Sequence, residues 1–197
     1  TTPIEETMEA LNDLVRSGKV RYIGASSGPA WQFQKANAIA EKNGWAKFVS
    51  MQNLYNLIYR EEDRETNPYC LDSGIATIPY SPLAKGILAG KNRNTKREQT
   101  DPVRDLVFAK EGNNDDAIVN RVVEVAEKHK RSPAQIALAW MLTKPHITSP
   151  IVGFSSEAQI HDTIKSLEVE LTQEDIDYLE ELYIPHKVVN FFPAVKK

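Results

Sequence analysis

The sequence predicts an α/β fold in which short parallel strands alternate with helices along 197 residues. Three observations support this prediction: brief apolar runs, longer segments with apolar residues at helical spacing, and capping residues where those segments begin. Parallel strands need long crossover connections, which helices usually supply. Strict alternation of the two patterns therefore indicates a parallel sheet covered by helices.

The first part of the chain is expected to form three strands with helices between them. A helix begins at Thr2, where Thr-Pro-Ile-Glu supplies an N-cap, a proline at the first helical position and a capping-box glutamate. A later helix is interrupted, because Pro68 cannot continue a helix interior. The expected strands cover residues 20–25, 48–52 and 74–79, and the expected helices cover 2–17, 30–43 and 62–73.

The second part of the chain adds helices and a fourth strand after a long polar stretch, residues 89–114. A loop of this length in a compact domain is usually functional or mobile. Ser132 and Ser156 each begin a capping box with a glutamine three residues later, and Thr172 begins the last helix. The expected helices cover 116–129, 132–143, 156–167 and the residues from 172, and the expected strand covers 148–152.

Composition excludes several classes of protein. The net charge is −3 and no basic block is present, which argues against nucleic acid as a partner. No apolar run reaches the length of about 18 residues that a membrane span needs. The single cysteine, Cys70, excludes an internal disulfide framework, has no metal-ligand spacing around it, and fits a reducing, cytoplasmic location. The absence of an initiator methionine suggests that the chain starts partway through a longer protein.

Polar and small residues follow all four expected strands. A doubly wound nucleotide-binding fold would place a Gly-rich turn after the first strand, but the segment Gly24–Gly28 does not match that fingerprint. Four strand ends that contribute to one rim are typical of a barrel, and a closed barrel needs eight strands. Residues 1–197 are therefore predicted to form half of a (β/α)8 TIM barrel, with about four parallel strands, outer helices and no separate second domain. The strand-end residues are Ser26 and Ser27, Gln52 and Asn53, Tyr80 and Ser81, and Gly153 and Ser155.

The segment Ile78–Leu88 is the most informative of these strand ends. It offers an aromatic face at Tyr80, a hydroxyl at Ser81, a cation at Lys85 and a glycine at position 86. Such groups suit a flat heterocycle and a pyrophosphate, whereas the alternative interpretation is simply a strand followed by a Pro/Gly turn. The acidic run 61–63 is interpreted as a solvated face or a helix start.

Five segments match one family in order and spacing: Lys19–Ser27, Met51–Asn56, Pro79–Gly86, Ser132–Trp140 and Pro150–Gln159. On these motifs the chain resembles the carboxyl-terminal half of an aldo-keto reductase over essentially its whole length. A further segment, Tyr55–Asp63, is similar to the fungal aryl-alcohol-dehydrogenase-like branch. The resemblance implies a (β/α)8 barrel that binds NADP(H) and interconverts small-molecule aldehydes or ketones and alcohols by hydride transfer.

The resemblance also implies a role for each cofactor-binding position. Hydroxyl and amide groups after the first two strands would hold the nicotinamide carboxamide, and Tyr80 would stack on the nicotinamide ring. The loop that follows Tyr80 would line the pyrophosphate, and the start of a later helix would hold the adenosine end. These sets are, in order, Ser26, Ser27 and Gln52; Ser81, Leu83, Lys85 and Gly86; and Gly153, Ser155, Ser156, Gln159 and Asp162.

The chain also departs from the family pattern. Ser27 stands where many members have asparagine, and Thr163 stands where asparagine usually binds adenine. No Arg or Lys lies between Gly153 and Thr163, so NAD remains an alternative to NADP. The family's catalytic Asp, Tyr, Lys and His come from the first four strands, and none of the four histidines here ends an expected strand.

These departures leave the catalytic set of this chain empty. The isolated chain is therefore expected to be inactive, and a truncated remnant or a regulatory, binding subunit of the same fold remains an alternative. Open barrel edges predict self-association, because unpaired strand edges invite pairing with another chain.

Overall fold

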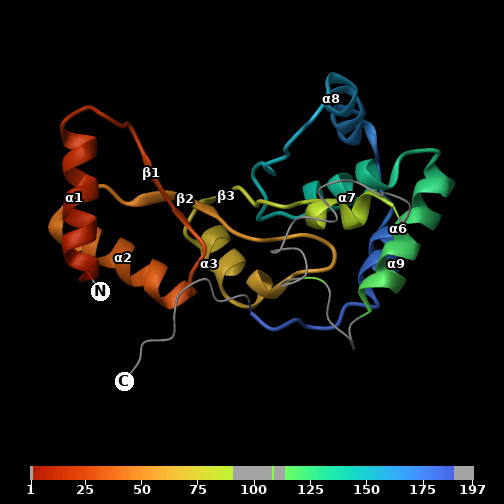
Figure 1. Cartoon of the computed structure of the whole chain (residues 1–197). Coiled ribbons are helices and arrows are strands. Elements are labelled where there is room, and N and C mark those ends of the chain that lie inside the picture. Colours follow the sequence, from red (N-terminus) through yellow and green to blue (C-terminus); the bar gives the residue numbers. More distant parts are fainter. Residues whose placement is uncertain (1, 91–107, 109–113, 189–197) are drawn as a thin grey trace.

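The computed structural model describes residues 2–90, 108 and 114–188. It confirms an α/β fold with parallel strands. Three strands form one parallel sheet in the order β1-β2-β3 (Figure 1). They are β1 (Ile23–Ser26), β2 (Phe48–Gln52) and β3 (Ala76–Thr77). Most of the expected polar stretch 89–114 lies outside the described residues.

The first strand begins three residues later than expected. The N–H groups of Lys19 and Val20 both donate to the carbonyl of Leu14, at 3.2 and 3.4 Å, so the chain is still folded back on the preceding helix. Gly24 then pairs with Ser50 beside a β-bulge. A Cβ atom at Gly24 would lie 2.4 Å from Oγ of Ser50 and 3.3 Å from its carbonyl oxygen, so glycine lets the two strands approach without displacing the Ser50 side chain.

The expected fourth strand, 148–152, does not form a regular strand. One isolated parallel bridge joins Ile147 to Thr77, and the N–H of Ile151 donates to the carbonyl of Pro79 at 2.8 Å. The ladder cannot continue through Pro79, because proline has no N–H to donate. In the part of the chain that the structure describes, the expected set of about four strands is thus three strands and an extended segment beside β3.

Three helices accompany the sheet in the first part of the chain, but their ends differ from expectation. The first helix has Pro3 as its N-cap and no side-chain cap, so the capping box expected at Thr2 is wrong. Pro68 occupies the first turn of its helix, where a missing N–H costs nothing, and a separate 3₁₀ turn, Glu61–Arg64, precedes that helix. The helices are α1 (Ile4–Arg16), α2 (Ala30–Asn43) and α3 (Thr66–Asp72).

Four α-helices follow among the described residues from 114 onward. The capping boxes at Ser132 and Thr172 are both formed, and each begins a helix as expected. The helices are α6 (Asp115–His129), α7 (Pro133–Leu142), α8 (Glu157–Ile164) and α9 (Gln173–Glu180). The 3₁₀ segments are η2 (Ala84–Ala89) and η3 (Lys165–Glu168). None of the described helices is long and apolar enough to cross a membrane.

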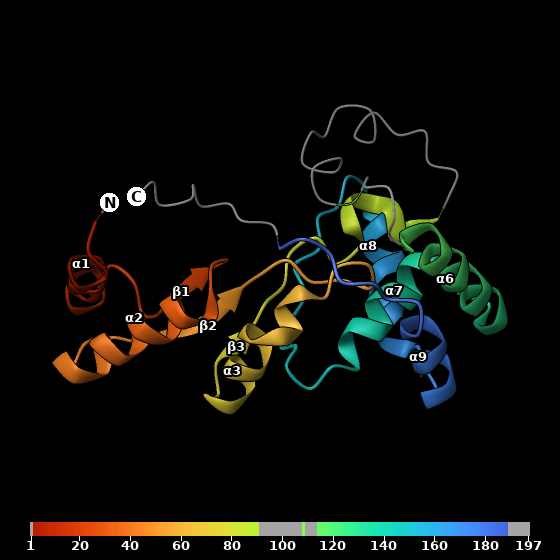
Figure 2. The same ribbon diagram turned by 90° about the horizontal axis from the view of Figure 1, so that it is seen from below.

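The largest apolar core lies among the carboxyl-terminal helices rather than under the sheet. It joins the buried loop after β2 to η2, α6, α7 and α9, and Figure 2 shows these helices gathered on the side away from α1 and α2. Trp140, at its centre, is fully buried and stacks on Tyr55 with ring centroids 5.7 Å apart. A smaller cluster around Met8 and Ile23 joins α1, β1 and α2.

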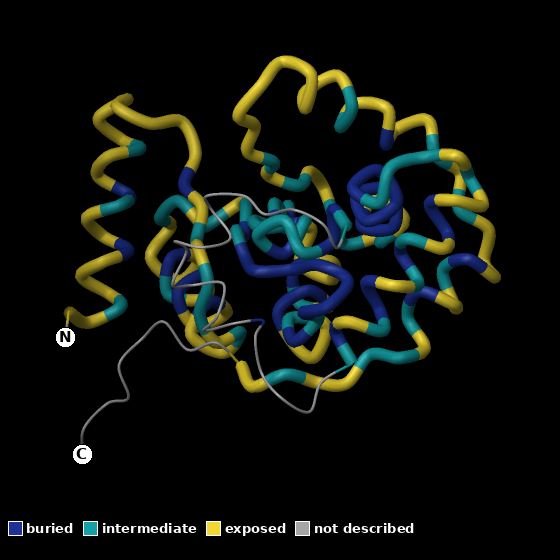
Figure 3. Tube along the Cα trace, turned by 45° about the vertical axis from the view of Figure 1, so that its right-hand side comes forward, coloured by how far each residue is buried: buried dark blue, intermediate teal, exposed yellow. Residues whose placement is uncertain are grey.

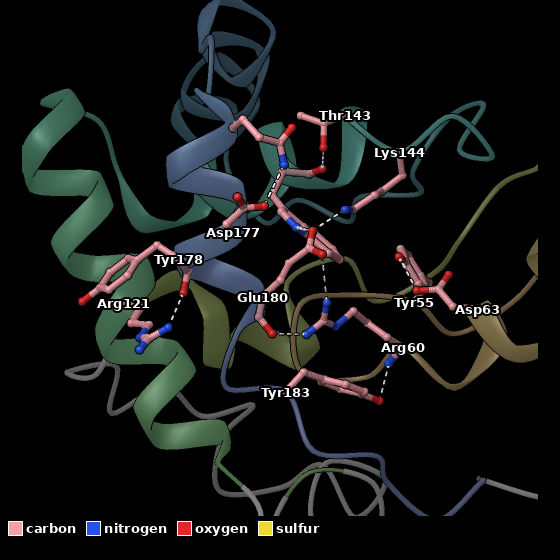
Figure 4. A network of polar contacts seen from close by, with 12 residues as sticks. Tyr55, Arg60, Asp63, Arg121, Thr143, Lys144, Asp177, Tyr178, Glu180 and Tyr183 are labelled. Carbon is pink, nitrogen blue, oxygen red and sulfur yellow. Dashed lines mark hydrogen bonds and ion pairs between the residues drawn. The ribbon is translucent and has the colours of Figure 1, made fainter.

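A polar network ties the loop after β2 to α9 (Figure 4). The guanidinium of Arg60 lies between Glu180 and the ring of Tyr183, donating to the Glu180 carbonyl at 2.9 Å and lying 4.1 Å from the ring centroid. The side chain of Glu180 also accepts from the indole N–H of Trp140 at 2.7 Å. The loop that leaves the end of β2 is therefore fixed from its far side by α9.

Candidate functional site

Three of the predicted strand-end residues lie together where the sheet ends. Ser27 follows β1 directly, and its backbone N–H donates to the carbonyl of Gln52, the last residue of β2, at 2.9 Å. The side chain of Ser27 lies close enough to Tyr80 to influence the pKa of the Tyr80 hydroxyl. Tyr80 is held in turn through its N–H, which donates to the carbonyl of Asn53 at 2.8 Å. Ser26 ends β1 beside this group and is exposed.

Tyr80 presents a half-buried aromatic ring whose hydroxyl stays protonated. Burial raises the pKa of Tyr80, the charge of Glu62 adds to that effect, and the nearby Ser27 side chain offsets only part of it. Since the ordinary pKa of tyrosine is about 10, the group is neutral at physiological pH. This arrangement suits a packing surface and a neutral hydrogen-bonding group, whereas a proton donor for carbonyl reduction needs a pKa near the working pH.

The loop after Tyr80 has an unusual backbone. Ser81, Ala84 and Lys85 all have positive φ values, of 54°, 48° and 59°. Non-glycine residues rarely adopt this conformation, and such strain tends to cluster at functional sites. Leu83 packs against the large core, and its carbonyl accepts from the N–H of Gly86 at 2.8 Å. Gly86 itself has a φ of 98° and open space where a side chain would project.

The residues predicted for the adenosine end lie at the start of α8. Ser156 caps the helix, and its hydroxyl accepts from the N–H of Gln159 at 3.4 Å. The side chain of Gln159 instead accepts from the N–H and the hydroxyl of Ser155, at 2.9 and 3.1 Å. The expected capping box is therefore only half formed. Gly153 precedes this turn and has open space around its Cα.

Asp162 faces the neighbouring helix. Its carboxylate accepts from the hydroxyl of Ser132 at 3.1 Å and from the amide of Gln135 at 2.8 Å, which attaches α8 to the start of α7. The hydrogen bond from the N–H of Ile151 to the carbonyl of Pro79 holds the segment before α8 beside the end of β3. Pro79 directly precedes Tyr80. Both predicted groups therefore leave the sheet from the same edge, although no hydrogen bond between described residues joins them directly.

Two residues near the rim have no signal in the sequence that marks them. Asn56 is fully buried, and its amide donates to the carbonyl of Ser81 at 3.0 Å. Glu62 belongs to the acidic run interpreted as a solvated face or a helix start; it does lie in a 3₁₀ turn, but it is half-buried. Burial raises the pKa of Glu62, and the neighbouring Asp63 and Glu61 charges raise it further. Only the path of the chain brings these residues to the strand ends.

The rim combines groups that can hold an uncharged amide, a flat ring and an anion. Hydroxyl and amide side chains at Ser27 and Gln52 supply both donors and acceptors. The capped start of α8 supplies helix N–H groups, which attract anions. Among the described residues, no three His, Cys, Asp or Glu side chains are grouped so that they could hold a metal ion.

Comparison with known proteins connects this geometry to a family. Residues 1–184 match the sequence model of the Aldo/keto reductase family. The chain is 53% identical over 190 residues to versiconal hemiacetal acetate reductase from Aspergillus parasiticus, an alignment covering 95% of this chain and 55% of that protein. It is 49% identical over 185 residues to a Schizosaccharomyces pombe protein whose name assigns it provisionally to the aryl-alcohol dehydrogenases, with 92% and 51% covered.

A third relative supports the same assignment. An aldo-keto reductase from Fusarium vanettenii is 44% identical over 190 residues, with 95% of this chain and 51% of that protein covered. The chain thus spans about half the length of the curated relatives it matches. By its matches and its parallel α/β structure, the chain belongs to the aldo-keto reductase family, resembles that family's fungal aryl-alcohol-dehydrogenase-like proteins, and covers part of the family's TIM barrel.

Proposed function

We propose that the protein to which this chain belongs is an oxidoreductase that interconverts small aldehydes or ketones and alcohols with a nicotinamide dinucleotide. This chain would supply the part of the barrel that holds the cofactor. The observation that carries the proposal is that Ser27, Gln52 and Tyr80 come together from three strand ends, since the N–H of Ser27 donates to the carbonyl of Gln52 and the N–H of Tyr80 donates to the carbonyl of the next residue, Asn53.

The residues present fit such a cofactor. Ser26, Ser27 and Gln52 would hold the carboxamide, and Tyr80 would cover one face of the nicotinamide ring. The bound dinucleotide would supply the hydride. Ser81, Leu83, Lys85 and Gly86 would line the pyrophosphate, and the open space at Gly86 leaves room for it.

The start of α8 would hold the adenosine end, through Gly153, Ser155, Ser156, Gln159 and Asp162. We propose NADP as the preferred form, on the family resemblance. NAD is the alternative, because no Arg or Lys lies between Gly153 and Thr163 to pair with a 2′-phosphate. The capped helix start can attract a phosphate without such a cation.

We further propose that the catalytic residues of the whole protein lie outside this chain. At the described strand ends, no carboxylate, lysine and tyrosine or histidine lie together in hydrogen-bonding contact. The pKa of Tyr80 is also raised rather than lowered. The isolated chain would then bind cofactor without turnover. A regulatory or binding subunit of the same fold is the alternative, which stable association with a larger partner would support.

We also propose that residues 1–197 form one partial barrel and that this partial barrel associates with a second copy of the chain. In the described sheet β1 has a partner on one side only, and three apolar side chains of one helical face, Ile160, Ile164 and Leu167, are 39%, 54% and 71% exposed. Unpaired strand edges favour pairing with a second chain. The free, buried Cys70 supports a reducing compartment, and we propose the cytoplasm.

Fluorescence titration of the chain with NADPH, and with NADH in parallel, tests the cofactor proposal. Saturable binding is expected, and Tyr80→Ala should weaken it about fivefold or more, since stacking on an aromatic side chain is worth about 1–3 kcal/mol. Tyr22→Ala is the matched control, because Tyr22 is 75% exposed and should leave binding unchanged. A folded chain that binds neither dinucleotide would overturn the proposal.

A further inference from the structure

The strained loop after Tyr80 is held by a side chain from a different part of the chain. The carbonyl oxygen of Ser81 accepts two hydrogen bonds, one from the N–H of Ala84 at 2.9 Å and one from Nδ2 of Asn56 at 3.0 Å. The first bond is local and closes a turn. The second comes from the loop after β2, 25 residues earlier in the sequence.

Asn56 is itself fixed on every side. Its Oδ1 accepts from the N–H of Ile58 at 3.1 Å, which forms an Asx turn. Its backbone N–H and carbonyl are paired with Tyr59, both at 3.1 Å, and the residue is fully buried. The side-chain amide therefore cannot rotate without losing both of its hydrogen bonds, and its Nδ2 points at the Ser81 carbonyl.

The hydrogen bond from Asn56 orients the peptide group between Ser81 and Pro82, which has few other hydrogen bonds. The peptide after Ser81 leads into Pro82, which has no N–H, so the Ser81 carbonyl is the only hydrogen-bonding group of that peptide. Ser81 is also the first of the positive-φ residues in the loop. Such conformations persist only where the surroundings over-determine them.

From these contacts we infer that Asn56 is a positioning residue for the dinucleotide site. It acts through Ser81, orienting the loop of residues 81–86 whose backbone and side chains line the pyrophosphate. This inference rests on the proposed cofactor function of the loop. Asn56 touches no cofactor itself, so it should affect affinity for groups bound by the loop and leave the adenosine end of the site unchanged.

Asn56→Asp is the direct test, because aspartate keeps the acceptor of the Asx turn and replaces the Nδ2 donor with a charged oxygen that repels the Ser81 carbonyl. Binding of NADPH is measured by fluorescence titration, and binding of adenosine 2′,5′-bisphosphate, which lacks the pyrophosphate and the nicotinamide, is measured by calorimetry. We expect the NADPH dissociation constant to rise about tenfold or more and the bisphosphate constant to change less than about twofold. All titrations are made well below the melting midpoint of each variant.

Asn37→Asp is the matched control. Asn37 is also a buried asparagine whose Oδ1 accepts from a backbone N–H, that of Phe48 at 2.9 Å, but it lies at the opposite end of β2 from the rim. It should lose some stability and keep both binding constants. Asn56→Ser, whose shorter hydroxyl can support the turn but cannot reach Ser81, is the second variant if Asn56→Asp does not fold.

The outcomes separate the two proposals. If the unmodified chain fails to bind NADPH, the cofactor function and this inference fall together. Normal NADPH binding by the unmodified chain and by a folded Asn56 variant would overturn only the positioning role. An equal loss in the Asn37 variant, or an equal loss for the bisphosphate, would also overturn it, since both results indicate a general structural effect.

Discussion

The amino-terminal region, α1, β1 and α2, and the carboxyl-terminal region, α6, α7 and α9 with the loop after β2, bury their apolar residues very differently. The amino-terminal cluster has four buried members, Met8, Ile23, Ala36 and Ala40, whereas the carboxyl-terminal core includes whole aromatic rings. Figure 3 shows the difference as a mostly exposed α1 beside a continuous buried interior. The candidate site lies where the two regions meet, since Ser27 follows β1 and Tyr80 packs against the large core.

This contrast shows that the large core supplies most of the buried apolar contact and also holds the loops after β2 and β3. The amino-terminal region contributes β1 and Ser27 to the rim from a much smaller cluster. Substitutions that remove one contact from each region therefore test this difference.

The largest effect is expected from two matched tryptophan substitutions. Trp140→Ala removes a fully buried ring at the centre of the large core and should cost about 3–5 kcal/mol of unfolding free energy. Trp31→Ala removes a ring in α2 that is 60% exposed and should cost about 0.5 kcal/mol or less. Urea unfolding followed by circular dichroism measures both, and similar losses for the two variants would contradict the comparison.

A smaller loss is expected at the polar network of Figure 4. Glu180→Gln keeps a partner for the indole of Trp140 but removes the charge that faces Arg60 and Lys144. Because the side chain of Arg60 is only 10% exposed, the cost should be about 1–3 kcal/mol. The exposed neighbour provides the control: Glu181→Gln should cost less than about 1 kcal/mol, since its carboxylate pairs with Arg121 at the surface. Equal costs would show that burial of the network does not matter.

The pH dependence of stability should come partly from Asp175. Burial alone would raise the pKa of this carboxyl, but hydrogen bonds from Lys128, His129 and Thr172 outweigh it and hold the pKa well below its ordinary value. A lowered folded-state pKa adds stability above the unfolded pKa of about 4, and this stability is lost as the pH falls below it.

Asp175→Asn should therefore destabilise the chain by about 2 kcal/mol at pH 7, and by progressively less below about pH 4. Chemical unfolding at several pH values measures the difference between the two proteins. A difference that stays constant down to pH 3 would mean that the carboxylate charge contributes nothing.

The smallest effect on stability is expected at the exposed face of α8 and η3. The double substitution Ile164→Gln and Leu167→Gln should change unfolding free energy by about 0.5 kcal/mol or less, because both side chains are mostly exposed. The same change should shift self-associated chains toward monomer in sedimentation velocity. An unmodified chain that sediments as a monomer at all concentrations would refute the self-association.

Particular residues show which features the sequence can predict. The Ser132 capping box is local, so four consecutive residues determine it. The meeting of Ser27, Gln52 and Tyr80 follows from the alternation of strands and helices, because parallel strands place their carboxyl ends at one edge. These features need only the order of the elements along the chain.

Other features depend on contacts that no local pattern encodes. The bond between Asn56 and Ser81 requires two loops to follow one particular path. The expected fourth strand, 148–152, is only an extended segment, because its pairing with β3 ends at Pro79. The missing cap of α1 is similar, since Thr2 has the right residue type and spacing but Pro3 takes the N-cap position. Tertiary packing decides such details after the pattern is satisfied.

The first measurement is hydrogen–deuterium exchange of this chain with and without saturating NADPH. If the strand ends bind the cofactor, exchange should slow in peptides that cover residues 26–28, 52–59, 80–88 and 153–159, and should not change in α1 or α9. Exchange that is identical with and without NADPH in a folded chain would contradict the claim that these strand ends form the cofactor platform.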